Sequence, residues 1–251
     1  DLALSVTQNM AQIKAMISMS NVSELTQMNE TEDMLSIGAM VSYQDSHQLL
    51  TKLYPEFGQM LYRLGSKQVR NSGTLGGNVG NASPIGDTPP VLIALGAKLV
   101  LRKGARRREI SVEDYFVDYK VTKLEAGEFI QSIEIPKATS KKQLKVFKIS
   151  KRLDDDISTV LACFSIEFSK QKVVDIKIAF GLPLLFNPNF VPRSYNKLNS
   201  TYLPLFNSWI SFSFFVHFLN ILFLINFFTI CAKAIPTSLI NKKSFSQLSI
   251  L

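Results

Sequence analysis

The sequence predicts an α+β fold, and three observations support this prediction. Four apolar residues recur at the helical positions i, i+3, i+4 and i+7 within residues 55–66, namely Phe57, Met60, Leu61 and Leu64. Apolar and polar residues alternate in residues 128–136, as in a half-buried strand. The segments with strand character cluster after residue 96, behind a part of the chain that is mostly helical in pattern.

The first third of the chain is expected to hold two helices, over residues 44–54 and 55–66. Pro55 suits the first turn of the second helix, because proline needs no backbone hydrogen bond there. Residues 34–43 predict a strand in which Gly38 permits a close backbone approach. Residues 10–19 alternate imperfectly and fit a strand as well as a helix.

The next part is expected to begin with a short helix in PPVLIALGA, with Asp87 as its cap and Gly96 at its end. A strand pair around a turn at Gly104 follows, in AKLVLR and RREIS. Later strands are expected in EFIQSIEIP, KVFKISKR, TVLACFSIEF and VVDIKIAF, the last two as a hairpin. A subdomain boundary is predicted near residues 137–142.

Composition divides the 251-residue chain into two parts. Every acidic residue lies at or before Asp175 and every glycine at or before Gly181, whereas Phe, Leu, Ile, Asn and Ser dominate the rest. The net charge of +8 therefore reflects this acid-free tail in part, and it does not indicate a nucleic-acid surface. The basic residues at 103 and 106–108 are expected to form a solvated hairpin tip.

Metal and disulfide chemistry are not indicated by the spacing of cysteine and histidine. Cys163 and Cys231 are far apart with no C-x-x-C motif, and His47 and His217 are isolated. The acidic stretch RLDDD, residues 152–156, is expected to be a charged turn, because three adjacent carboxylates rarely point at one ion. The sequence shows no signal-peptide charge pattern, and we expect a cytoplasmic protein.

Residues 70–101, RNSGTLGGNVGNASPIGDTPPVLIALGAKLVL, carry the strongest candidate site. Glycine lets backbone amides approach a ligand closely, and successive amides before a helix attract anions. Thr74 and Ser83 add hydroxyl donors, Asn78 adds an amide, and Asp87 can accept from sugar hydroxyls. This chemistry suits a nucleotide-like or polyol ligand. The alternative is a purely structural segment with tight turns.

The same segment resembles the FAD-loop signature of the flavin subunit or domain in the xanthine dehydrogenase family of molybdenum hydroxylases. The resemblance continues, in the family's order, through EFIQSIEIPK, FKISKRLDDDISTV and IKIAFG, and it reaches back to DLALSVTQ at the first residue. It covers about residues 1–181 and is closest to the bacterial type with a separate small subunit.

This resemblance implies an FAD-binding domain of the vanillyl-alcohol-oxidase (PCMH) type over residues 1–137. The start of a small α+β domain, similar to the C-terminal domain of carbon monoxide dehydrogenase flavoproteins, would follow over residues 138–181. In this family electrons pass from a molybdenum cofactor through two 2Fe–2S clusters to FAD, which reduces NAD+, during purine (hypoxanthine or xanthine) oxidation. The expected partners are the molybdenum-binding subunit and the 2Fe–2S domain of the same enzyme, and the task of this chain is to bind and orient FAD.

The resemblance also implies roles for individual residues. The FAD phosphates and ribityl chain would be cradled by Thr74, Leu75, Gly76, Gly77 and Asn78, and Asp87 would hold a polar group of the cofactor. Leu64 lies where the family has an apolar or aromatic contact, and Ile130 matches a further flavin-contacting position.

Two more residues are implied at the flavin ring. Lys148 would lie beside the pyrimidine and stabilise negative charge on reduced flavin. Tyr119 would cover the isoalloxazine near the nicotinamide site. Ordinary core positions for Ile130 and Tyr119, and a solvated strand position for Lys148, are the alternatives.

The sequence departs from the family pattern at both ends. Asp1 matches the last residue of an upstream phosphate loop, so we expect an FAD domain that lacks its N-terminal part and many diphosphate contacts. Residues 182–251 have no family counterpart and suggest either translated non-coding sequence or a membrane anchor at 209–232, which is long and free of charged residues. The rival functions are therefore a membrane-anchored protein with a structural glycine segment and an inactive gene-fragment product.

Overall fold

The computed structural model describes residues 2–118, 120–137, 142–169, 172–181 and 194–196. The chain divides into two compact units, one of residues 1–165 with 177–195 and one of residues 166–176 with 196–251. In the second unit, the described residues are those of a hairpin at 166–169 and 172–176, and residue 196. Every element of the candidate site belongs to the first unit.

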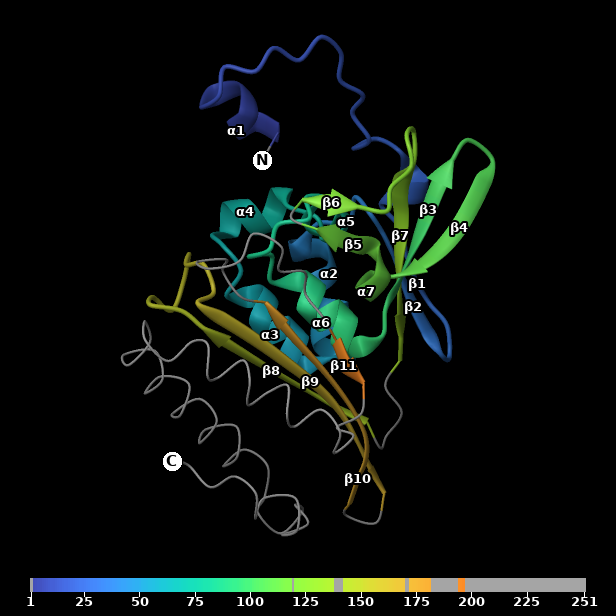
Figure 1. The fold of residues 1–251 in the computed structure, drawn as a ribbon, viewed down its shortest axis with the longest axis vertical. Helices are drawn as coiled ribbons and strands as arrows, with labels where there is room; N and C mark the ends of the chain where they lie inside the picture. The colour runs from blue at the N-terminus through green and yellow to red at the C-terminus, as the bar shows by residue number, and fades with distance from the viewer. Residues whose placement is uncertain (1, 119, 138–141, 170–171, 182–193, 197–251) are drawn as a thin grey trace. The chain divides into compact units, whose positions relative to one another are not determined.

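A five-stranded antiparallel sheet has the strand order β1-β2-β7-β3-β4 (Figure 1). The strands are β1 (Met28–Glu30), β2 (Met34–Gly38), β3 (Lys98–Lys103), β4 (Arg106–Ser111) and β7 (Phe129–Pro136). In the register of the central strand β7, Ile133 lies opposite both Ile37 and Leu99. These three side chains are fully buried, so the alternating pattern of β7 places one face of the sheet in the core.

A second sheet has the order β11-β10-β9-β8, and two short strands form a separate pair. The members are β8 (Lys142–Ile149), β9 (Val160–Ser169), β10 (Lys172–Gly181) and β11 (Ser194–Asn196), and the separate pair is β5 (Phe116–Asp118) with β6 (Val121–Thr122). The predicted strands after residue 96 lie within a few residues of β3, β4, β7, β8, β9 and β10, whereas β5, β6 and β11 were not predicted.

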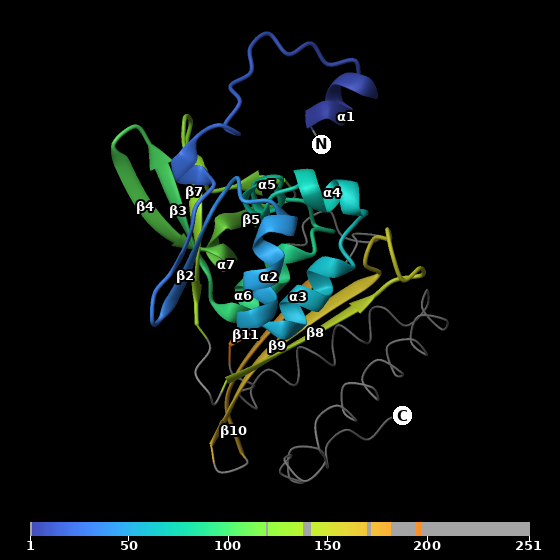
Figure 2. The ribbon, with the colours of Figure 1, turned by 180° about the vertical axis from the view of Figure 1, so that it is seen from behind.

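The helices of the first unit are short (Figures 1 and 2). The helical segments are α1 (Leu2–Thr7), a 3₁₀ turn (Ser23–Leu25), α2 (Tyr43–Leu53), α3 (Pro55–Tyr62), α4 (Lys67–Ser72), α5 (Leu75–Gly80), α6 (Thr88–Leu95) and α7 (Val112–Tyr115). Helices α5 and α6 contact β7, and α3 and α6 contact β8. The α+β prediction is confirmed.

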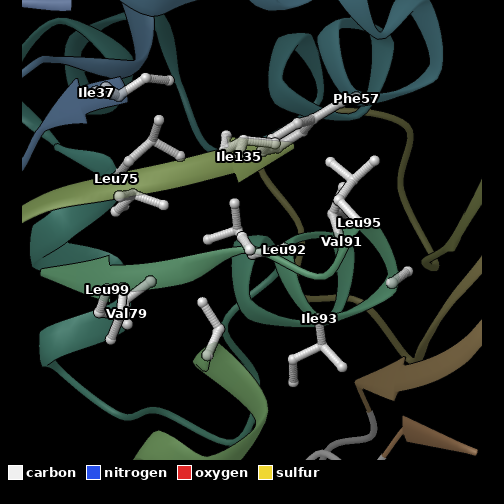
Figure 3. Packing of buried hydrophobic residues seen from close by; sticks show 14 of the residues in the cluster. Ile37, Phe57, Leu75, Val79, Val91, Leu92, Ile93, Leu95, Leu99 and Ile135 are labelled. Atoms are coloured by element: carbon white, nitrogen blue, oxygen red, sulfur yellow. The ribbon is translucent and has the colours of Figure 1, made fainter. Parts of the chain in front are cut away.

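The core joins these helices to the five-stranded sheet. Figure 3 shows Leu75 of α5 and Leu92 of α6 near Ile37 and Ile135 of the sheet, and all four side chains are fully buried. Helix α6 is buried along its whole length, which explains its uniformly apolar sequence. Phe57, Met60 and Leu61 of α3 join the same cluster, with Leu64 packed against it, as the helical spacing predicted.

Three predictions of local structure were wrong in part. Residues 10–19 form neither a helix nor a strand, and Met10, Met16 and Ile17 there are exposed. The strand expected over 34–43 ends at Gly38, and Ser42 caps the next helix; the close backbone approach expected at Gly38 is present, since a Cβ there would collide with the Leu25 carbonyl. The helix expected over 55–66 ends at Tyr62, before Gly65 with its positive φ of 58°.

The basic hairpin tip is only partly solvated. Gly104 makes the turn with a φ of 58°, as predicted. Arg106 pairs with Glu125, however, and Arg108 holds Glu128 through two hydrogen bonds. The charge run therefore ties β4 to the chain before β7, which a count of charges along the sequence did not reveal.

The hydrophobic segment 209–232, Cys231 and His217 lie outside the described residues, as does Tyr119. Among the helices that the structure describes, none is long and apolar enough to cross a membrane. The predicted domain boundary near 137–142 falls largely on residues 138–141, which are also outside the described ranges, and it stays a prediction.

Candidate functional site

Residues 67–80, which include the start of the glycine segment, form the two short helices α4 and α5, with Gly73 and Thr74 between them. Both helices begin at a hydroxyl cap: Ser66 Oγ accepts from the Val69 amide and Thr74 Oγ1 accepts from the Gly77 amide. Each cap satisfies a backbone donor that the first turn of a helix leaves free. The signal in the sequence was a hydroxyl residue three positions before each of these amides.

Two of the glycines are required by packing inside the chain. A Cβ at Gly76 would lie 2.5 Å from the Ala39 Cβ and 2.6 Å from its backbone, and one at Gly73 would lie 2.6 Å from the Tyr43 ring. Such distances are far below van der Waals contact. Gly73 and Gly76 therefore let α5 lie directly against the chain that joins β2 to α2.

The other two glycines face outward. Gly77 and Gly80 are exposed, three residues apart on α5. A Cβ at Gly77 would meet only the Thr74 hydroxyl, at 2.8 Å, and one at Gly80 only the Ile130 Cδ1, at 3.5 Å, among the described residues. Glycine costs a helix about 1 kcal/mol relative to alanine. Internal packing does not explain this cost at Gly80, and at Gly77 the only group that a Cβ would displace among the described residues is the Thr74 hydroxyl. The outer face of α5 is thus bare backbone that a ligand can approach closely.

The apolar site residues predicted from the sequence differ in what they present to this face. Ile130 of β7 lies next to Gly80 and is mostly buried. The Leu75 side chain is fully buried in the core, so only its main chain is available to a ligand. Leu64 follows α3 and is partly buried against the same core. The structure brings Ile130 to the outer face of α5 and directs the Leu75 side chain away from it.

Asn78 is engaged in a polar network under α5. Its Oδ1 accepts from the Thr88 hydroxyl at 2.5 Å and from the Thr88 amide at 3.4 Å. Its side chain also forms a hydrogen bond with the Tyr43 hydroxyl. Burial raises the pKa of Tyr43, with the negative charge of Asp87 as a second cause, and the bond to Asn78 opposes this rise. Asn78 therefore connects α5 to the start of α6 by hydrogen bonds.

Asp87 does not cap α6 with its side chain, so that prediction was wrong. Its carboxylate is instead buried in a cluster with Lys148 of β8 and Ser158. Lys148 Nζ donates to Asp87 Oδ2 at 2.6 Å and to Ser158 Oγ at 2.7 Å, and Ser158 Oγ donates to Asp87 Oδ1 at 2.6 Å. A buried charge must be paired or it destabilises the fold, and this competition from Lys148 explains the missing cap.

Lys148 has a third acceptor, the Asp156 carbonyl at 3.1 Å. An ammonium group carries three N–H donors, and all three are used inside the chain. A direct hydrogen bond from Lys148 to a flavin would therefore require one of these acceptors to be released. The solvated-strand alternative does not hold for Lys148, since 2% of its side chain is exposed.

The buried carboxylate of Asp87 also affects the Cys163 thiol of β9. The pKa of the Cys163 thiol is raised, first because the thiol is fully buried and second because the negative charge of Asp87 disfavours a thiolate. Cys163 is consequently held as a neutral thiol in the core and not as a nucleophile.

Sequence reasoning missed Ser158 and Thr88, which complete the networks of Asp87 and Asn78. Thr88 directly follows Asp87 and Ser158 follows Ile157 in the sequence, and only the tertiary contacts single them out. Ser83 is half-buried, and its carbonyl accepts from the Gly86 amide in the turn before α6. Residues 151–155 form the charged turn that RLDDD predicted.

Comparison with known families gives two matches along the chain. Residues 1–138 match the FAD binding domain in molybdopterin dehydrogenase, and residues 145–182 match the CO dehydrogenase flavoprotein C-terminal domain. The first match alone spans more than half of the 251 residues.

Curated relatives include several enzymes with different substrates. Xanthine dehydrogenase of Drosophila subobscura is 33% identical over 184 residues, which cover 66% of this chain and 14% of that protein. The glyceraldehyde dehydrogenase medium chain of Sulfolobus acidocaldarius is 30% identical over 167 residues, which cover 66% of this chain and 59% of that protein. The chain thus spans only a minor part of the xanthine dehydrogenases it matches.

Solved structures share the fold. A carbon monoxide dehydrogenase chain from Hydrogenophaga pseudoflava superposes with a TM-score of 0.69 at 24% identity, over 78% of this chain and 66% of that one. Quinoline 2-oxidoreductase from Pseudomonas putida 86 gives a TM-score of 0.61 at 27% identity, over 71% of this chain and 60% of that one.

These matches agree with the bare glycine face of α5 and with the order of the motifs along the chain. The chain belongs to the family of FAD-binding domains of the molybdopterin dehydrogenases, and it is a flavoprotein component of the molybdenum hydroxylase type.

Proposed function

We propose that this chain is the FAD-binding electron-transfer component of a xanthine dehydrogenase-type enzyme. It would receive electrons from 2Fe–2S clusters held by a partner and pass them through FAD to NAD+ while a molybdenum-binding partner oxidises hypoxanthine or xanthine. Xanthine dehydrogenases at 32–33% identity support the purine assignment. The glyceraldehyde dehydrogenase and a nicotinate hydroxylase, both at 30%, are the competing substrate classes.

The observation that carries the flavin role is the outer face of α5. Gly77 and Gly80 leave main-chain atoms exposed, with Ile130 beside Gly80, and the only close neighbour that a Cβ at either would displace among the described residues is the Thr74 hydroxyl. Such a surface lets a phosphate or a ribityl chain approach the main chain closely. Thr74 fixes the first turn of α5, and Asn78 fixes its underside.

When bound, FAD supplies the redox chemistry, and the protein supplies its position and electrostatic surroundings. The main chain of residues 74–78 and the Ile130 side chain would hold the cofactor. The Lys148–Asp87–Ser158 cluster would present a fixed arrangement of charge, because every donor of the ammonium is already satisfied. We therefore propose that Lys148 acts on the flavin through its charge and not as a hydrogen-bond donor.

A spectroscopic test addresses flavin binding first. The purified full chain is incubated with FAD, passed through gel filtration and examined for the visible flavin band that co-elutes with protein. The proposal expects a band with the wild type and its loss with Gly77→Val. A wild-type protein that is folded yet carries no flavin would contradict it.

The structure also selects the right control for that test. Gly76→Val would collide with the Ala39 backbone and is expected to unfold α5, so loss of flavin there would not identify the binding face. A Cβ at Gly77 meets only the Thr74 hydroxyl among the described residues, so Gly77→Val is expected to weaken that cap and to leave the rest of the fold in place, which its circular dichroism spectrum checks.

The purine assignment needs the complete enzyme. Flavin reduction is followed in the assembled complex after addition of xanthine, glyceraldehyde or nicotinate under anaerobic conditions. Reduction by xanthine at the highest kcat/KM supports the assignment. Preference for the aldehyde or for nicotinate would replace the purine while leaving the flavin role intact.

A further inference from the structure

Arg63 links helix α3 to the end of strand β8 and to the acidic turn, which is defined here as residues 150–158. Its Nη1 donates to the Lys148 carbonyl at 3.0 Å, its Nη2 to Ser150 Oγ at 3.2 Å, and its Nε to the Leu153 carbonyl at 3.2 Å. The three donors reach three residues that are 85 or more positions away in the sequence. A guanidinium holds its N–H donors in a fixed planar fork, which suits acceptors spread along a strand end and a turn.

The acidic turn is braced internally by Asp156. Its Oδ2 accepts from the Arg152 amide at 2.7 Å, and its Oδ1 accepts from the Ile157 amide at 3.1 Å. These contacts lower the pKa of Asp156, with the Arg152 amide as the largest cause, so the carboxylate remains ionised in its capping role. Asp155 has a positive φ of 49°, which shows that the turn is held in one specific conformation.

The same turn supplies two of the three acceptors of Lys148. These are the Asp156 carbonyl and Ser158 Oγ, while Asp87 supplies the third. Displacing the turn would therefore leave the buried ammonium with Asp87 alone. Since Arg63 contacts both the Lys148 main chain and the turn, it fixes the lysine and its acceptors relative to α3 at once.

We propose that Arg63 is a positioning residue for the buried Lys148 ammonium: it pins the acidic turn so that Asp156 and Ser158 stay within hydrogen-bonding distance of Nζ. The effect of Arg63 on a bound flavin rests on the proposed function above. Its effect on Lys148 does not.

The test measures the reactivity of Lys148 directly in the full chain. N-hydroxysuccinimidyl acetate is added without FAD, and the acetylation rate of Lys148 is compared by peptide mass spectrometry with that of Lys98, whose side chain is 54% exposed. Lys148 should react slowly in the wild type. In Arg63→Met its rate relative to Lys98 should rise about tenfold or more, because three hydrogen bonds that hold the turn are lost.

Arg102→Met is the matched control. Arg102 is also partly buried, with 27% of its side chain exposed, and it donates to the Gly104 carbonyl far from the acidic turn in sequence. The acetylation rate of Lys148 in Arg102→Met should equal that in the wild type. Protection of the buried Cys163 thiol from alkylation reports that each variant retains its core.

An unchanged Lys148 rate in folded Arg63→Met would overturn the proposal. If Arg63→Met loses Cys163 protection, Arg63→Lys decides. This variant keeps the positive charge but replaces the planar fork of donors by a single ammonium nitrogen, and the proposal expects a Lys148 acetylation rate between those of the wild type and a denatured control. A wild-type rate in that variant would also overturn it. A second readout is the midpoint potential of bound FAD, which should fall in Arg63→Met. If the wild-type protein binds no flavin, the proposed function is refuted, while the result of the Lys148 labelling still stands.

Discussion

Two ion pairs of equal length lie in very different surroundings. Lys148–Asp87 and Arg108–Glu128 both have an N–O distance of 2.6 Å. In the first pair the exposed side-chain fractions are 2% and 10%, and the partners come from β8 and the turn before α6. In the second pair the exposed side-chain fractions are 26% for the arginine and 1% for the glutamate, and the partners come from β4 and the turn before β7.

The difference lies in what remains when one partner is removed. Arg108 can be hydrated, and Glu128 keeps a hydrogen bond from the Glu125 amide. Lys148, with 2% of its side chain exposed, has no comparable access to water, and the Lys148–Asp87 pair depends on its two members and on Ser158. We infer that the first pair maintains the candidate site and that the second only fastens a hairpin to the sheet.

Breaking the buried pair should give the largest effect on stability. Lys148→Met leaves Asp87 as an uncompensated buried charge and is expected to cost about 3–5 kcal/mol in the free energy of unfolding. Urea denaturation followed by circular dichroism measures this loss. Arg108→Met serves as the comparison and should cost clearly less; equal losses would remove the distinction between the two pairs.

Removing both buried charges should restore much of that stability. The double variant Lys148→Met, Asp87→Leu replaces the pair by apolar groups, and such replacements of buried ion pairs are often close to neutral. Its urea midpoint should exceed that of Lys148→Met. A midpoint below that of the single variant would mean that Asp87 stabilises the fold by contacts other than the lysine.

The hairpin pair should be recognisable by its pH dependence. The two hydrogen bonds from Arg108, and then the Glu125 amide, lower the pKa of Glu128 from 4.5 to about 2. A carboxyl whose pKa is lowered on folding contributes stability above its ordinary pKa, and this contribution is lost as the pH falls towards the folded value.

The stability difference between wild type and Glu128→Gln should therefore be largest near neutral pH and shrink below 4.5. Urea midpoints at a series of pH values check this. A difference that is constant with pH would show that Glu128 acts by shape and not by charge.

The Lys98–Glu109 pair, which is exposed on both sides, should have the smallest effect on stability. Lys98 and Glu109 are 54% and 59% exposed at a distance of 3.0 Å, so both ions stay hydrated. Lys98→Met should change the free energy of unfolding by about 1 kcal/mol or less. A loss comparable to that of Lys148→Met would contradict the role assigned to burial.

The sequence predicted the elements with strong periodicity and missed those fixed by distant contacts. The pattern of β7, the helix over 88–95 and the turn at Gly104 all follow from local rules, and they were found. The caps at Ser66 and Thr74 were local signals that the glycine count obscured.

The sequence singled out several residues that the structure places in shared hydrogen-bond networks, but it did not predict how they are arranged. Glycine spacing marked α5, yet only the three-dimensional structure separates the packing glycine at 76 from the open one at 77. Likewise, Asp87 and Lys148 were each singled out, but their direct pairing across 61 residues could not be inferred from the local pattern. Nor could the hydrogen bonds that Ser158 makes with both.

The central claim is that the outer face of α5 binds FAD, and one titration tests it most directly. FAD is titrated into wild type, Gly77→Ala and the neighbouring surface control Gln68→Ala, and the thermal midpoint of each is measured without cofactor. In Gly77→Ala the gain in helix propensity and the disturbance of the Thr74 cap are each about 1 kcal/mol, so the midpoint should stay near that of the wild type. The account predicts a Kd raised about tenfold or more in Gly77→Ala alone, because its methyl group blocks close approach to the main chain. Equal Kd values in all three proteins would contradict it.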